Sequence, residues 1–69
     1  EKLVEPNHTA LASARSNLAF AYAGLGNFTE AERLYRSAAE AFRSAYGPDS
    51  VAYARTLRNL GQVYLQQGE

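Results

Sequence analysis

The chain has 69 residues, and its seven basic side chains balance seven acidic ones, so the formal net charge is zero. This balance argues against a nucleic-acid-binding domain, which normally carries a basic excess, and no apolar run approaches the ~20 residues that a membrane-spanning helix needs. The absence of Cys excludes disulfides and thiolate zinc sites and fits a reducing compartment, and the charged stretch 1–6 is unlike a signal peptide, so we expect a cytoplasmic protein.

The first predicted helix spans residues 9–25. Its apolar residues recur at steps of three and four, as on one face of an α-helix: Leu11, Ala14, Leu18, Tyr22 and Leu25. Pro6 and Asn7 suit a helix entrance, which places His8 in the turn before the helix. Gly24 and Gly26 should end the helix, because glycine adopts the left-handed conformation at little cost.

The second predicted helix spans residues 29–46. Its apolar stripe consists of Ala31, Leu34, Tyr35, Ala38, Phe42 and Ala45, with the two small residues Ala31 and Ala38 expected at close contacts between helices. Thr29 and Glu32 have the spacing of a capping box at the helix start. Glu32 and Arg36 are expected to form an ion pair on the outer face. Tyr46 closes this helix and is expected to fill the turn that follows.

The third predicted helix spans residues 50–67, after a break and cap at residues 47–50. Its apolar stripe is Tyr53, Leu57, Leu60 and Tyr64, and Gly68 ends it. Short loops force neighbouring helices to run antiparallel. The sequence therefore predicts an all-α fold of three antiparallel helices.

The chain also repeats itself at an offset of 42 residues. Seven of the 27 aligned pairs are identical, and they begin at Pro6, Ala10, Ala12, Asn17, Leu18, Tyr22 and Gly26. This predicts a segment of a longer protein, in which residues 1–4 end a preceding helix, residues 5–46 form one full repeat, and residues 47–69 form the first half of the next. Successive helix hairpins that stack to bury their remaining faces form a right-handed α-solenoid, of about one and a half repeats here. The third-helix stripe would stay half covered, so we expect the free fragment to self-associate.

The motifs along the helices and in the turns resemble those of the tetratricopeptide repeat family. The matching positions, in order, are Leu18, Ala19, Tyr22, Gly26, Asn27, Phe28, Ala31, Glu32, Leu34, Tyr35, Ala38 and Pro48. The 42-residue period looks like the longer-helix variety found in kinesin light chains, and similar arrays lie beside signalling ATPases in bacteria and fungi. One departure is Arg15, where the family has a large apolar residue and the next copy has Leu57. The resemblance implies a repeat array that binds a protein or peptide in its concave groove.

The sequence lacks a combination of side chains suited to catalysis or metal binding. His8 is the only His, with no Cys and no paired carboxylates at ligand spacing. The serines lack a partner His, and the glycines at 24 and 26 follow a helix rather than a strand, unlike a phosphate loop. We therefore expect no enzyme activity, no cofactor and no metal site.

The candidate site lies on the first helix of each repeat, which, as the resemblance implies, lines the groove. There, Asn17 and Asn59 would hold the backbone of an extended ligand through their amides; alternatively, each sets the stacking register by bonding to a neighbouring helix. The surrounding polar and aromatic residues are Ser13, Ser16, Phe20, Arg55, Arg58 and Gln62. Arg55 and Arg58 are three residues apart and could bind carboxylates, or could form an ordinary solvated face.

Two functional hypotheses follow. In the first, the chain is an interaction module that binds a protein or peptide segment, with no nucleic-acid or membrane partner. In the second, it is a structural or regulatory array that self-associates or forms the sensor region of a larger signalling ATPase.

Overall fold

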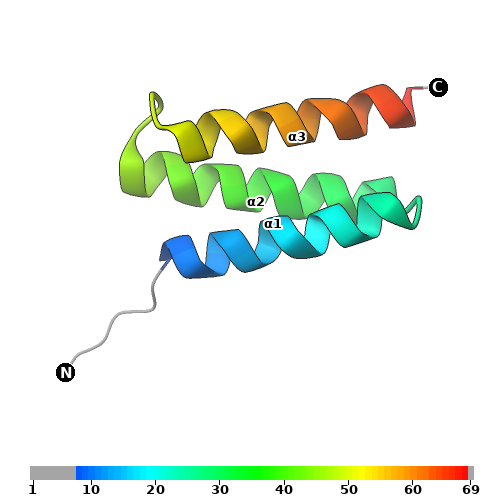
Figure 1. Cartoon of the computed structure of the whole chain (residues 1–69), viewed down its shortest axis with the longest axis horizontal. Coiled ribbons are helices and arrows are strands. Elements are labelled where there is room, and N and C mark those ends of the chain that lie inside the picture. The colour runs from blue at the N-terminus through cyan, green and yellow to red at the C-terminus, as the bar shows by residue number, and fades with distance from the viewer. Residues whose placement is uncertain (1–7, 69) are drawn as a thin grey trace.

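The computed structural model describes residues 8–68. They form three helices, α1 (His8–Gly24), α2 (Phe28–Tyr46) and α3 (Val51–Gln67), and the described residues contain no strand. The helix α2 packs against both α1 and α3, and consecutive helices run in opposite directions, so that α1 and α3 are parallel (Figure 1). The all-α prediction is confirmed, and each helix begins and ends within one residue of its predicted bounds.

The turn between α1 and α2 is built on Gly26. This residue has a φ of 83°, and its amide donates to the carbonyl of Ala23 at 3.0 Å, while the amide of Asn27 donates to the carbonyl of Tyr22 at 2.9 Å. This pair of bonds is the Schellman arrangement, which satisfies carbonyls left over at the helix end. The predicted helix stop is therefore confirmed. At the other end of α1, His8 is the first helical residue rather than part of a turn, while Pro6 and Asn7 lie outside the described residues.

The predicted capping box at the start of α2 is wrong. The helix begins at Phe28, Asn27 takes the cap position without a side-chain hydrogen bond, and Thr29 already lies inside the helix. The carboxylate of Glu32 is engaged elsewhere, because it pairs with Arg36 at 3.0 Å and accepts from the Tyr64 hydroxyl at 3.3 Å. The predicted pair of Glu32 with Arg36 is thus confirmed.

The turn between α2 and α3 follows the predicted break. Gly47 has a φ of 95° and a ψ of 164°, a backbone conformation that is almost exclusive to glycine. Ser50 caps α3, and its hydroxyl accepts from the amide of Tyr53 at 3.1 Å. Tyr46 does not fill the turn: it is 58% exposed, and its ring stacks on Phe42 with 6.2 Å between centroids.

Two clusters of buried residues hold the three helices together. One is formed by Ala19, Ala31, Leu34, Tyr35, Leu60 and Val63. The other is formed by Ala12, Ala38 and Phe42, with Ala41, Ala52 and Tyr53 packed against it. The predicted stripe of α2 is buried apart from Ala45, which is exposed. The helix in the middle therefore supplies most of the core.

The predicted core face of α1 is wrong. Leu11, Leu18 and Leu25 are all exposed, Leu18 to 49%, whereas Ala12 and Ala19 are fully buried. Small side chains let α1 approach α2 closely, so Ala12 and Ala19 pack inward while the leucines of α1 stay about half exposed. On α3, Thr56 and Val63 join Leu60 in the core, while Leu57 and Tyr64 remain partly exposed. The half-covered stripe fits the expectation of self-association, which stays a prediction.

Gly61 offers a direct test of how closely the helices approach. The repeat places it at the position of Ala19, yet a Cβ built on Gly61 meets no atom within 4 Å. Gly61→Ala should therefore stabilise this chain by about 0.5–1 kcal/mol, because alanine loses less backbone freedom in a helix. Thermal denaturation followed by circular dichroism measures this change. Gly47→Ala is the matched control and should lower the melting temperature, since its positive φ strains any side chain; a lower melting temperature for Gly61→Ala would contradict the open packing at this position.

Candidate functional site

Two adjoining cavities lie between the parallel helices α1 and α3, over a floor supplied by α2. The first has a volume of about 240 Å³ and is lined by Ser13, Ser16, Asn17, Phe20, Tyr35, Phe42, Ala52, Arg55, Thr56 and Asn59. The second has a volume of about 290 Å³ and is lined by Phe20, Ala23, Gly24, Tyr35, Asn59, Gln62, Val63 and Gln66. The two share three residues and are therefore continuous; together we call them the α1–α3 groove.

Most of the residues singled out in the sequence lie in this groove. The first cavity contains Ser13, Ser16, Asn17, Phe20, Arg55 and Asn59, and the second contains Gln62. Arg58 is exposed on α3 and lines neither cavity. Three residues along an α-helix correspond to a rotation of ~300°, which leaves Arg58 ~60° away from Arg55 around the helix axis and places it on the outer rim.

Sequence reasoning missed the floor and one end of the groove. Tyr35 and Phe42 of α2 were assigned to the core alone, but both are buried residues with one edge on the groove. Gln66 was also missed, although it follows Gln62 by one helical turn, a spacing that predicts a shared face. Val63 lies beside it at the base of the second cavity.

Several polar groups of the groove have no partner among residues 8–68. The amide of Asn17 is exposed and that of Asn59 is half-buried, and neither hydrogen-bonds another helix within the described part of the chain. The hydroxyl oxygen of Ser16 is buried without any hydrogen bond, and such groups usually require a partner. Burial raises the pKa of the Tyr35 hydroxyl, so this phenol on the groove floor is neutral at physiological pH.

The charged residues divide between the helices. Within residues 8–68, α1 and α3 contain no Asp or Glu, and the three Glu residues all lie on α2. Each of these is paired with an Arg of the same helix: Glu30 with Arg33 at 2.6 Å, Glu32 with Arg36 at 3.0 Å, and Glu40 with Arg43. The hydrogen bonds from Arg43 lower the pKa of the Glu40 carboxyl.

Within residues 8–68, the arginines outside α2 are not paired with acidic groups. Arg15, at the position where the resemblance implies an apolar residue, donates to the Ser37 hydroxyl at 2.7 Å. Arg55 and Arg58 have neither an ion pair nor a hydrogen bond among the described residues. Arg55 lines the groove and Arg58 lies at its rim, and no acidic group among residues 8–68 pairs with either, so this side of the groove is positively charged.

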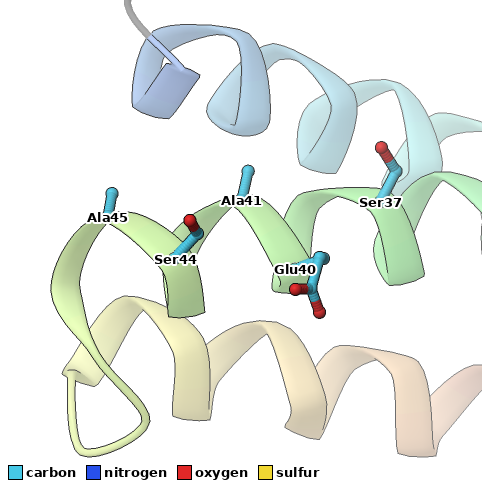
Figure 2. A pocket seen from close by; sticks show the side chains of 5 residues that line it. All are labelled: Ser37, Glu40, Ala41, Ser44 and Ala45. Atoms are coloured by element: carbon cyan, nitrogen blue, oxygen red, sulfur yellow. The ribbon is translucent and has the colours of Figure 1, made fainter.

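A cavity of about 550 Å³ lies elsewhere, on the surface of α2. Figure 2 shows its lining residues, Ser37, Glu40, Ala41, Ser44 and Ala45, all from that one helix. Their side chains are small apart from Glu40, which is held by Arg43, and Ser37 is held by Arg15. This hollow therefore brings together no unpaired charge and none of the predicted site residues.

Two further features, a metal-binding group and a membrane-spanning helix, are absent from the described part of the chain. Residues 8–68 contain no group of three His, Cys, Asp or Glu side chains placed to hold a metal ion. None of the three described helices has the length and apolar character needed to cross a membrane.

A comparison with known protein families gives a match that covers all three helices. The family model described as "Tetratricopeptide repeat" matches residues 4–69, a range that includes all three helices. Searches of the curated proteins and of the solved structures give no significant match.

Proposed function

Because the chain belongs to the tetratricopeptide repeat family, whose repeats generally mediate protein–protein interaction, we propose that the α1–α3 groove binds an extended segment of a partner protein. The family is typically non-catalytic. The observation that carries the proposal is the unpaired Arg55 beside the free amides of Asn17 and Asn59 in one cavity. A ligand would satisfy these groups, which the described residues leave open.

Each of these groups suits a different part of an extended ligand. An amide offers both a donor and an acceptor, so Asn17 and Asn59 would bond the peptide backbone at two successive points. Arg55 would hold a carboxylate through forked hydrogen bonds, and Arg58 on the rim would attract the same acidic residue at longer range. The ligand is therefore an acidic segment, and its binding should weaken as salt rises.

We further infer that the repeat is the 42-residue variety similar to that of kinesin light chains, with a full repeat at residues 5–46 and the start of another at 47–69. Helices of 17, 19 and 17 residues support this longer form. The exposed side chains of Leu18, Leu57 and Tyr64 offer apolar area to further helices or to a second copy, which supports an array that extends or self-associates.

Fluorescence anisotropy with labelled extended peptides that carry Glu residues tests the proposed groove. Replacing Arg55 and Arg58 together by Ala should weaken binding about tenfold, because charge-assisted bonds to a carboxylate contribute ~1.5–3 kcal/mol before screening. The helix content, measured by circular dichroism, should not change, since neither side chain makes an ion pair or a hydrogen bond with another described residue.

The matched control replaces Arg33 and Arg43, which are exposed and paired on α2. Arg36 is unsuitable for this purpose because it donates to the Tyr64 hydroxyl at 2.8 Å and so joins α2 to α3. Equal losses from the two double variants, or full affinity without Arg55 and Arg58, would move the ligand site away from this groove.

A further inference from the structure

The two ends of the α1–α3 groove differ in chemistry. The first cavity is lined by Arg55, its one charged residue among residues 8–68. The second contains no charged residue: its base is formed by Ala23 and Val63, and its rim carries the amides of Gln62 and Gln66. An uncharged hollow with an apolar base and a few polar groups at its edge is typical of a pocket for an apolar side chain.

Phe20 stands where the two cavities meet. It lines both of them and is nevertheless 73% exposed, the highest exposure of any aromatic residue in the described chain. A large aromatic ring that lies open inside a groove offers apolar area to a ligand, and such residues commonly dominate binding energy. On α3, Gln62 also lines the second cavity and occupies the position that the repeat offset aligns with Phe20, so α3 offers an amide there rather than a second aromatic ring.

The spacing of the two cavities fixes the spacing of the ligand. Arg55 and Gln62 are seven residues apart on α3, which corresponds to ~10 Å along the helix axis. An extended chain covers ~10 Å in three residues. A segment that lies along α1 and α3 therefore reaches the second cavity about three residues from the side chain held at Arg55.

We propose that the second cavity binds a large apolar side chain of the partner segment, about three residues from an acidic side chain held at Arg55, and that Phe20 determines this preference. The inference rests on the proposed function and specifies its ligand: a segment with one acidic and one apolar residue. The positively charged side of the groove complements the acid, and the uncharged end complements the apolar residue.

The probes are labelled peptides in a Ser- and Gly-based chain with one Glu and one Phe. In two peptides the Phe lies three positions before or three positions after the Glu. In a third peptide the Phe lies directly beside the Glu, and in a fourth it is replaced by Ser. The three-residue spacing should bind about tenfold or more tightly than the Ser peptide and the adjacent peptide, as expected for burial of one aromatic side chain. In backbone NMR spectra, the amides of Gly24 and Gln66 should shift with the Phe peptide and stay in place with the Ser peptide.

The variant Phe20→Ala should remove most of the difference between the Phe and Ser peptides. Leu65→Ala is the matched control, because Leu65 is also a large exposed apolar residue but lines neither cavity. If the Phe and Ser peptides bind equally well and both depend on Arg55, the proposed function stands and the apolar subsite is wrong. If no peptide binds, both are wrong; and if Phe20→Ala leaves the Phe preference intact, another residue forms the subsite.

Discussion

Leu60→Ala is expected to destabilise the chain by about 2–5 kcal/mol, the usual cost of removing a buried leucine side chain. Leu60 is 9% exposed and lies in the cluster to which all three helices contribute, together with Ala19, Leu34 and Val63. Truncation leaves a cavity there that backbone shifts cannot close without separating α3 from α2. A chain of this size has ~3–10 kcal/mol of stability in total, so a large fraction of the molecules should unfold.

Leu18→Ala is the informative control for this result. The 42-residue repeat aligns Leu18 with Leu60, so sequence reasoning alone assigns both the same loss. In the structure, however, Leu18 is 49% exposed and lies outside both buried clusters, and its replacement should cost less than half as much. Urea denaturation of the two variants provides the comparison. Equal losses would show that the leucine face of α1 is covered, for example by a second copy of the chain.

The rotated face of α1 shows what sequence periodicity leaves undetermined. The turns were predictable, because Gly26 and Gly47 have positive φ values that other residues rarely adopt. The buried face of α2 was predictable too, since its apolar and charged sides are clearly separated. The sequence of α1 instead has alanines around much of the helix besides the leucines, so that more than one side is apolar. Hydrophobicity favours burial of the leucines, whereas close helix packing favours burial of the alanines. Only the geometry of α2 decides which of the two faces is buried.

The candidate site was predictable to the extent that it depends on the repeat. Asn17 and Asn59 recur at the repeat period, and the parallel arrangement of α1 and α3 brings them to one cavity. The contribution of α2 was not predictable, because Tyr35 has a pattern typical of core residues and reaches the groove with only one edge. Arg58 is the opposite case, because a spacing of three residues from Arg55 places it outside both cavities.

Ala38→Leu is expected to destabilise the chain by about 1–3 kcal/mol through overpacking. Ala38 is fully buried in the second cluster, between Ala12 of α1 and Phe42 of its own helix, with Ala52 of α3 packed against the same cluster. Three added carbon atoms have no space there, because the small side chains are what allow the helices to approach. The chain can accommodate a leucine only by moving α1 or α3 outward, which would also expose parts of the other cluster.

Ala45→Leu provides the matched comparison on the same helix. Ala45 is two turns further along α2, in the predicted stripe, but it is exposed and lines the hollow shown in Figure 2. The same three carbon atoms added there should change stability by less than about 0.5 kcal/mol, as for other exposed substitutions. Thermal melting curves of both variants measure the difference. Intrinsic helix propensity changes nearly equally in the two substitutions, so a difference between their melting temperatures reports packing alone. An unchanged melting temperature for Ala38→Leu would mean that α1 and α3 can separate at this point without loss of stability.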